Sequence, residues 1–265
     1  MIGCDRLFYH PTRRQYDRPE RLRLAYESVS FPTADGLRLH GWFFPAVGAA
    51  TGTVLHLHGN AGNVTGHFHQ VCWLPAAGWN VLCFDYRGYR QSQGRVTRAG
   101  TIADAHAALD YLLQRPGVDP GGIVAFGQSL GGPVGIVLAA ERSELRGLVV
   151  DGAFDNYRGI ASWHIRRNPL LLLVAWWVPL LMSDGCDPID YVARVSPRPL
   201  LIMQGTADRI VDPRTARRLF DAAREPKELW LIDGADHYEA LDELADSTRP
   251  RLLEFLRKCV ERNPG

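Results

Sequence analysis

Strand-like and helix-like runs alternate along most of this chain, and the alternation is the feature that most restricts its fold. From Thr53 onward, short β-branched or aromatic runs are followed by longer runs with apolar residues at helical spacing. This order predicts right-handed crossovers and a mainly parallel sheet with helices on both faces. Because ligands of such sheets bind at the carboxyl ends of the strands, we expect functional residues in the loops that follow them.

The expected elements follow from this reading. The predicted strands cover residues 26–31, 37–44, 53–58, 80–85, 122–126, 145–150, 199–204 and 228–232, and the predicted helices cover residues 65–77, 101–114, 133–140, 213–223 and 250–260. Asp35-Gly36 predicts a hairpin between the first two strands. We expect residues 1–25 to form an N-terminal arm and residues 26–265 to form one domain.

Bulk composition restricts the function classes. With 265 residues, of which 46% are hydrophobic and 22% charged, the chain is large enough for one sizeable core. A net charge of +1 gives no reason to expect a nucleic-acid partner. The five scattered cysteines lack C-x-x-C spacing and indicate neither a disulfide framework nor a zinc site. No apolar run reaches the roughly 18 residues of a membrane span.

The alternation breaks between about residues 154 and 188, which predicts a small helical cap inserted into the domain. Its centre, Leu170 to Met182, is a run of 13 residues without a charge. We expect Leu173, Trp176 and Trp177 to contact an apolar substrate tail, and the insertion to touch a membrane surface. A helix that only packs on the core is the alternative.

A serine between two glycines, Gly127-Gln128-Ser129-Leu130-Gly131, lies between a predicted strand and a predicted helix. The pattern G-x-S-x-G in that context is typical of a nucleophile elbow, which exposes the serine hydroxyl at the apex of a sharp turn. Glycine removes the Cβ atoms that would clash as the two arms of the turn close.

A serine nucleophile needs a histidine base, and the base needs a carboxylate. His237 is the only histidine after the last predicted strand, and its position fits the chain order serine, acid, histidine. Asp208 follows the penultimate strand and is the preferred acid. Four other aspartates remain candidates; they are Asp212, Asp236, Asp151 and Asp155. Of these, Asp212 is the main rival, although its place before Pro213 favours a helix cap.

An acyl-transfer site also needs N–H donors for the oxyanion of its intermediate. One is expected from the residue after the nucleophile, Leu130. The second is expected from the loop His58-Gly59-Asn60-Ala61-Gly62, where the N–H of Asn60 is preferred and that of Ala61 is the alternative.

Five motifs in the expected order resemble the α/β-hydrolase superfamily, and in particular its Bem46-like group of serine hydrolases. They are Gly127 to Gly132, His58 to Asn63, Asp85-Tyr86-Arg87-Gly88-Tyr89, Gln204 to Asp208 and Gly234 to His237. The resemblance implies an α/β-hydrolase fold, a Ser129, Asp208, His237 triad, an oxyanion hole at Asn60 and Leu130, and no metal or organic cofactor. Arg90 and Asp151-Gly152-Ala153 depart from the group's pattern. These departures affect what can be inferred about the pocket rim and the substrate preference, but not the triad.

The expected activity is hydrolysis of carboxylic esters or thioesters, with a small acyl substrate that carries an apolar tail. A serine peptidase or amidase on the same residues is the alternative. Two further classes are a non-catalytic lipid-binding or protein-binding relative and a metal hydrolase that uses His56, His58, His67 and His69. We disfavour the metal site because the second pair falls in a predicted helix, where residues i and i+2 diverge.

The first residues, Met1 to Asp5, resemble the end of a bacterial lipoprotein signal with Cys4 as the lipid-bearing residue. This resemblance implies an envelope protein anchored through Cys4. A cytoplasmic protein is the alternative expectation.

Overall fold

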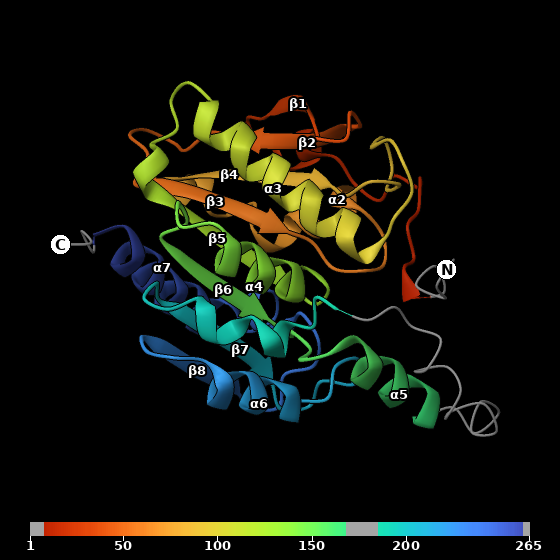
Figure 1. Cartoon of the computed structure of the whole chain (residues 1–265). Coiled ribbons are helices and arrows are strands. Elements are labelled where there is room, and N and C mark those ends of the chain that lie inside the picture. Colours follow the sequence, from red (N-terminus) through yellow and green to blue (C-terminus); the bar gives the residue numbers. More distant parts are fainter. Residues whose placement is uncertain (1–7, 168–184, 262–265) are drawn as a thin grey trace.

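The computed structural model describes residues 8–167 and 185–261. These residues form one sheet of eight strands in the order β1-β2-β4-β3-β5-β6-β7-β8 (Figure 1). The strands are β1 (Glu27–Pro32), β2 (Arg38–Phe44), β3 (Gly52–Leu57), β4 (Trp79–Asp85), β5 (Ile123–Gln128), β6 (Gly147–Asp151), β7 (Leu200–Gly205) and β8 (Lys227–Ile232). The first two are antiparallel to their neighbours, and the pairs from β4 to β8 are parallel. The predicted mainly parallel sheet is therefore confirmed.

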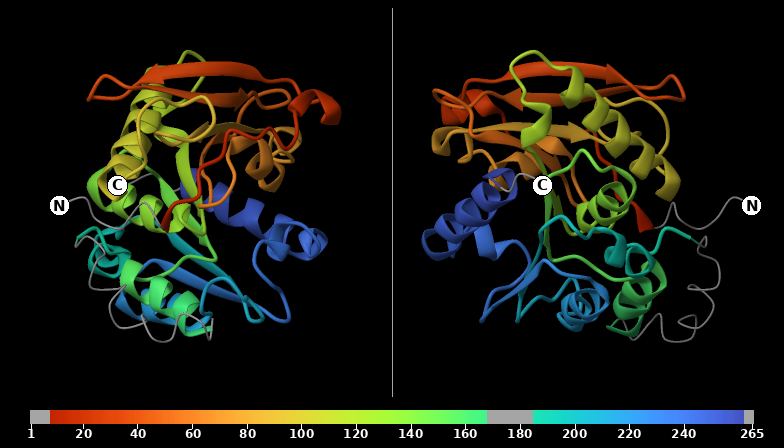
Figure 2. Two further views of the ribbon diagram at one scale, coloured as in Figure 1. Left: turned by 90° about the vertical axis from the view of Figure 1, so that its right-hand side faces the viewer. Right: turned by 60° about the vertical axis from the view of Figure 1, so that its left-hand side comes forward.

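Helices cover both faces of this sheet. The α-helices are α2 (Val64–His67), α3 (Arg98–Gln114), α4 (Gly131–Glu141), α5 (Tyr157–Arg167), α6 (Arg214–Ala222) and α7 (Ala245–Glu261). Figure 2 shows α7 on the side of the sheet opposite α3 and α4. Residues of β3 divide accordingly, since Leu55 and Leu57 pack in one core cluster with α3 and α4, and Val54 packs in the other with α7.

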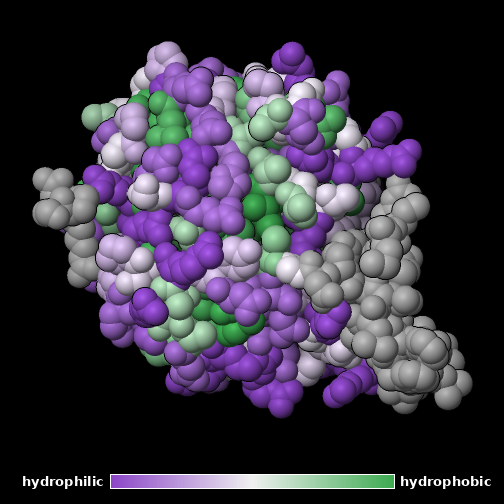
Figure 3. Space-filling view, viewed as in Figure 1, coloured by the Kyte–Doolittle hydropathy of each residue, from purple (hydrophilic) through white to green (hydrophobic). Residues whose placement is uncertain are grey.

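Every residue of β3, β5, β6 and β7 is buried. Strands covered on both faces need continuous rather than alternating apolar runs. Such runs are the signal from which these strands were predicted. The face in Figure 3 is largely hydrophilic, with separated hydrophobic patches. Within the described ranges, no helix has both the length and the apolar character needed to cross a bilayer.

The helix predicted for residues 65–77 is wrong. The segment contains the single turn α2 and two 3-10 turns at Phe68–Gln70 and Pro75–Ala77. Pro75 has no N–H to continue a helix from Val71 and instead begins a new turn. Gly66 weakens the first turn further, because glycine is a poor helix former. The last of these turns ends at Gly78, whose φ of +83° is typical of a glycine that terminates a helical turn.

The last helix begins earlier than predicted, at Ala245 rather than Pro250. Side chains near its start bind carbonyls of the preceding segment, which holds the additional turn in place. Thr248 Oγ1 donates to the carbonyl of Leu244 at 3.0 Å, and Arg249 donates to that of Leu241 at 2.9 Å. The insertion's centre, Leu170 to Met182, lies entirely within residues 168–184, outside the described residues, and Cys4 also lies outside them.

A buried ion pair fixes the loop that follows β4. Arg87 donates to Asp104 of α3 through its Nε at 2.9 Å and through its main-chain N–H at 2.7 Å. Asp104 is fully buried. The same guanidinium also pairs with Asp35 of the β1–β2 turn, whose side chain is 53% exposed.

Because removal of Asp104 leaves the Arg87 guanidinium with only its exposed partner Asp35 and its main-chain N–H without an acceptor, we expect Asp104→Ala to lower the free energy of unfolding by about 3 kcal/mol. The matched control is Asp35→Ala, which removes the exposed partner of the same arginine and should cost less than about 1 kcal/mol. Urea unfolding of both variants measures the difference. Equal losses would show that burial does not determine the strength of these pairs.

Candidate active site

Ser129 lies at the turn between β5 and α4, with a left-handed backbone conformation of φ 50°. This conformation is rare for residues other than glycine and marks local strain. The turn is held by a hydrogen bond from the N–H of Ser129 to the carbonyl of Asp151 at 2.8 Å. A Cβ at Gly127 would overlap the carbonyl of Gly131, and a Cβ at Gly131 would overlap that of Leu57. Both glycines are therefore required by the close approach of main chains.

His237 and Asp208 meet at the same edge of the sheet. His237, in the loop after β8, bonds Oδ2 of Asp208 through Nδ1 at 2.7 Å. Asp208, in the loop after β7, also accepts bonds from the N–H groups of Ile210 and Val211 at 2.8 and 2.9 Å and from the Gln204 amide at 2.8 Å. Burial alone would raise the pKa of Asp208, but His237 and these N–H groups outweigh it and lower that pKa below its ordinary value.

The other candidate acids have different partners. Asp212 pairs with Arg214 and accepts its main-chain N–H at the start of α6, Asp236 pairs with Arg209, Asp155 pairs with Arg218, and Asp151 accepts a long bond from Gln128. Of the five aspartates, Asp208 is the one that bonds the imidazole.

The imidazole of His237 packs against Gly152, which follows β6. A Cβ at Gly152 would lie 2.8 Å from Cε1 of His237, and Gly152 has a φ of +61°. The carbonyl that accepts the Ser129 N–H belongs to the preceding residue, Asp151. Asp151 therefore contacts the main chain of Ser129, and the adjacent Gly152 contacts the imidazole of His237. In the sequence, Asp151-Gly152-Ala153 was recognised only as a departure from the pattern of the Bem46-like group.

The hydroxyl of Ser129 does not bond His237 in this structure. It interacts instead with the hydroxyl of Tyr238, and within the described ranges Nε2 of His237 has no hydrogen-bond partner. Sequence reasoning missed Tyr238 entirely. Its position beside His237 was visible, but nothing in the sequence predicts that its side chain returns to Ser129.

The loop after β3 lies beside the nucleophile, and Asn60 within it is held from two sides. Its side chain bonds the N-terminal arm, donating to the carbonyl of Phe8 at 2.5 Å and accepting from the N–H of His10 at 3.1 Å. Tyr89, from the loop after β4, donates to the carbonyl of Asn60 at 2.7 Å. The carbonyl of Ala61 accepts a bond from Nε2 of His67 at 2.6 Å. Leu130 is fully buried at the start of α4.

The four histidines of the two H-x-H pairs do not form a metal site. Nε2 of His56 bonds Gln128 at 2.9 Å, His58 stacks on His67 with ring centroids 5.3 Å apart, and His69 pairs with Asp17 at 3.1 Å. Across residues 8–167 and 185–261, no group of three or more His, Cys, Asp or Glu side chains could hold a metal ion.

A cavity of about 270 Å³ adjoins this loop. It is lined by small and aromatic residues, namely Tyr16, Ala61, Gly62, Gly66, His67, Gln70 and Tyr238. Tyr238 therefore contacts both the cavity and Ser129. The predicted substrate contacts Leu173, Trp176 and Trp177 lie outside the described residues.

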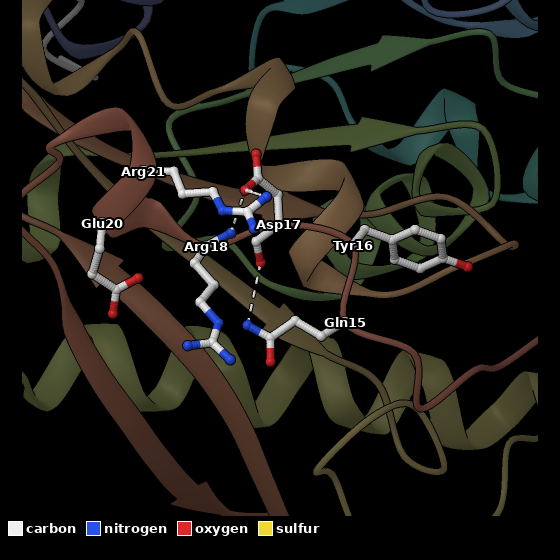
Figure 4. Close-up of a pocket in the computed structure, with 6 residues that line it drawn as sticks. All are labelled: Gln15, Tyr16, Asp17, Arg18, Glu20 and Arg21. Carbon is white, nitrogen blue, oxygen red and sulfur yellow. Dashed lines mark hydrogen bonds and ion pairs between the residues drawn. The ribbon is translucent and has the colours of Figure 1, made fainter.

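A second pocket, of about 550 Å³, lies on the N-terminal arm between Gln15 and Arg21 (Figure 4). Several of its polar groups already have partners within the pocket or beside it, such as His69 for Asp17 and Tyr26 for Glu20. Asp17 pairs with Arg21 at 3.5 Å and accepts the main-chain N–H of Arg18 at 2.8 Å. We assign it no part in the candidate site.

Comparison with known proteins identifies the fold and the family of this chain. The family model described as alpha/beta hydrolase fold matches residues 52–184. The uncharacterized protein YfhR of Escherichia coli strain K12 is 35% identical over 260 residues, which cover 96% of this chain and 87% of YfhR. The chain belongs to the α/β-hydrolase fold family, within its Bem46-like group.

A further relative agrees with this placement, and a solved structure shares the fold. Protein bem46 of Schizosaccharomyces pombe is 28% identical over 222 residues, covering 80% of this chain and 71% of bem46. The solved structure of the Pyrococcus furiosus esterase Pf2001 superimposes with a TM-score of 0.80 at 23% identity, covering 94% of this chain and 97% of that one. The fold and the family resemblance inferred from the sequence are confirmed.

The second carboxyl group near His237 makes stability depend on pH. Asp151 is 4% exposed, and burial raises its pKa from 3.8 to about 6, although His237 and Gln128 act in the opposite direction. Below about pH 4, Asp151 is largely neutral in both the folded and the unfolded protein, and its burial then costs little stability. Between the unfolded and the folded pKa the unfolded state ionises first, and the full cost is reached above the folded pKa.

We therefore expect Asp151→Asn to raise the free energy of unfolding above pH 6, by at most roughly 3 kcal/mol, and to leave it nearly unchanged at pH 4. Urea unfolding of the wild-type protein and the variant between pH 4 and 8 measures the difference in their free energies of unfolding. The contributions of the other carboxyl groups are the same in both proteins and cancel in this difference. A difference that does not vary with pH would contradict the raised pKa.

Proposed function

We propose that this protein is a serine hydrolase that cleaves carboxylic esters or thioesters through an acyl-enzyme on Ser129. The observation that carries the proposal is the strained serine at the elbow beside an imidazole bonded to a buried aspartate at 2.7 Å. An imidazole oriented in this way by a carboxylate is the standard base for a serine nucleophile.

The proposed reaction has two steps. His237 removes the proton of the Ser129 hydroxyl as the oxygen attacks the carbonyl carbon, and then gives that proton to the leaving alcohol or thiol. In the second step, His237 removes a proton from water, which attacks the acyl-enzyme and releases the carboxylic acid. Asp208 holds the Nδ1–H tautomer and stabilises the imidazolium.

In the first step the Ser129 hydroxyl must leave its contact with the Tyr238 hydroxyl and form a hydrogen bond to Nε2 of His237. Nε2 of His237 is the nitrogen that would accept the proton, and among the described residues it has no other partner. Rotation of the serine side chain about its Cα–Cβ bond, between staggered rotamers, is the proposed movement.

The oxyanion is proposed to bind the N–H groups of Leu130 and Asn60, with Ala61 as the alternative to Asn60. Leu130 begins a helix, where main-chain N–H groups point outward and the dipole favours negative charge. One such donor contributes about 2.7 to 4 kcal/mol in a serine protease. The bonds from the arm and from Tyr89 keep the second donor's loop in place.

Esters are preferred over amides as the proposed substrate. The Pyrococcus furiosus relative is described as an esterase, which favours ester cleavage. Fold alone does not determine the leaving group, because this scaffold serves many reactions. Amide analogues therefore belong in the first substrate panel, and amide cleavage as fast as ester cleavage would favour the peptidase reading.

The cavity of about 270 Å³ beside the loop after β3 is the proposed site for an apolar acyl chain. Its small residues, Ala61, Gly62 and Gly66, leave the space, and the rings of Tyr16 and Tyr238 supply apolar walls. An apolar pocket with polar groups at one end is typical of small-molecule sites.

We expect Ser129→Ala to lower kcat for p-nitrophenyl esters by at least about 10⁴-fold, because the nucleophile is lost. We expect Asp208→Asn to lower it by about 10³-fold to 10⁴-fold, because the amide favours the wrong tautomer of His237. Initial rates measure both effects. The wild-type protein should react with a fluorophosphonate probe at Ser129, identified by mass spectrometry, and keep its activity in a strong chelator.

The matched control is Asp212→Asn, four residues along the same loop, which should retain activity within about threefold. If Asp212→Asn were as damaging as Asp208→Asn, the assignment of the acid would be wrong. If Ser129→Ala kept most of the activity, the serine mechanism would be wrong.

We expect Gly66→Leu to shorten the preferred acyl chain, because its side chain enters the cavity. A Cβ at this position meets Tyr16 at 3.5 Å, an ordinary contact, so the main chain need not move. The loss in kcat/KM should increase from p-nitrophenyl acetate to the octanoate, and Gly66→Ala serves as the smaller control. A uniform loss along the ester series would place the acyl chain elsewhere.

A further inference from the structure

Tyr238 has a backbone conformation that needs an explanation. Its φ is 72° and its ψ is −8°, a left-handed conformation that bulky residues rarely adopt. Such strain persists where the surrounding structure requires it, and it concentrates at functional sites. The residue directly precedes the short turn at Glu239–Leu241 and directly follows His237.

The conformation directs the tyrosine hydroxyl between the nucleophile and the loop after β3. The hydroxyl interacts with that of Ser129. It also lies so close to Gly59 that a Cβ there would overlap the hydroxyl oxygen. The ring is held by neighbours on both sides, with centroids 4.2 Å from that of His237 and 5.9 Å from that of His67.

These contacts locate a hydroxyl donor where the oxyanion would form. The carbonyl carbon of a substrate bonds to Oγ of Ser129, so its oxygen lies two bonds from the atom that Tyr238 now contacts. Gly59 precedes Asn60, the proposed main-chain donor, so the hydroxyl also lies beside the loop that carries this donor. Burial raises the pKa of Tyr238, which keeps the hydroxyl protonated and able to donate.

We propose that Tyr238 supplies a third, side-chain donor to the oxyanion hole, in addition to the two main-chain N–H groups. In the resting state its hydroxyl bonds Ser129. When His237 takes up the serine proton, the tyrosine hydroxyl donates instead to the carbonyl oxygen, on which negative charge develops. This inference rests on the proposed serine mechanism and adds a catalytic residue to it.

A donor fixed before the reaction begins is effective, because no reorganisation is needed as the charge appears. The packing of Tyr238 between His237, His67 and Gly59 meets that condition. The same packing explains why glycine is needed at position 59, since any side chain would push the hydroxyl away from Ser129.

The test is Tyr238→Phe, which keeps the ring and removes only the hydroxyl. Loss of one oxyanion donor lowers kcat by about 10²-fold to 10³-fold, so we expect a decrease of at least about 10²-fold for p-nitrophenyl butyrate with little change in KM. The rate is counted per serine labelled by a fluorophosphonate, so that misfolded protein does not contribute. Tyr26→Phe is the control, because its hydroxyl bonds Glu20 instead, and it should keep wild-type activity.

A second measurement separates an oxyanion role from a purely structural one. A trifluoromethyl ketone that adds to Ser129 forms an anionic hemiketal, which resembles the tetrahedral intermediate. Its inhibition constant should rise in Tyr238→Phe by about the same factor as kcat/KM falls. A structural role would lower the labelled fraction without changing the inhibition constant.

An unchanged or increased kcat/KM in correctly labelled Tyr238→Phe would overturn the inference and leave the serine mechanism intact. An unchanged inhibition constant would do the same. By contrast, a wild-type protein that neither reacts with the fluorophosphonate nor depends on Ser129 would refute the proposed function itself.

Discussion

The site depends on a close approach of main chains around Ser129. Gly127 and Gly131 face the carbonyls of Gly131 and Leu57 with no space for a side chain. This contact fixes α4 against β3 and β5 and forces Ser129 into a strained conformation. Because Leu57 is the last residue of β3, the same contact sets the distance between the serine and the loop that contains Asn60. One steric constraint therefore positions both the nucleophile and the proposed oxyanion donors.

That loop is held by segments that are distant in sequence. Phe8 and His10 of the arm bond the side chain of Asn60, and Tyr89 bonds its carbonyl. The loop that carries Tyr89 is in turn fixed by the buried pair of Arg87 and Asp104. The arm and the loop after β4 thus belong functionally to the site, although neither contains a residue of the proposed triad.

Two buried carboxyl groups near His237 show opposite changes in pKa. Asp208 accepts bonds from four donors, and three of them, His237 and the N–H groups of Ile210 and Val211, outweigh burial and lower its pKa. Asp151 accepts a single long bond from Gln128, and burial raises its pKa to about 6. Of the two carboxyl groups near the imidazole, Asp208 is therefore stabilised in its charged form, whereas Asp151 resists ionisation. Separation of this kind is common where two acids serve different roles.

The sequence by itself determined the fold class and which loops form the candidate site. Buried parallel strands need continuous apolar runs, and the parallel arrangement brings their carboxyl ends to one edge, so Ser129, Asp208 and His237 could be chosen from order and position alone. The single helix expected at residues 65–77 failed because Gly66 and Pro75 act locally against a pattern read over thirteen residues.

Only the tertiary structure decided the contacts between loops. It paired His237 with Asp208 rather than with Asp212 or Asp151, because the choice among carboxylates depends on where each loop turns after its strand. It also brought Tyr238 to Ser129 and made room for His237 at Gly152. Such contacts are set by backbone conformations within irregular loops, for which the sequence has no periodic signal.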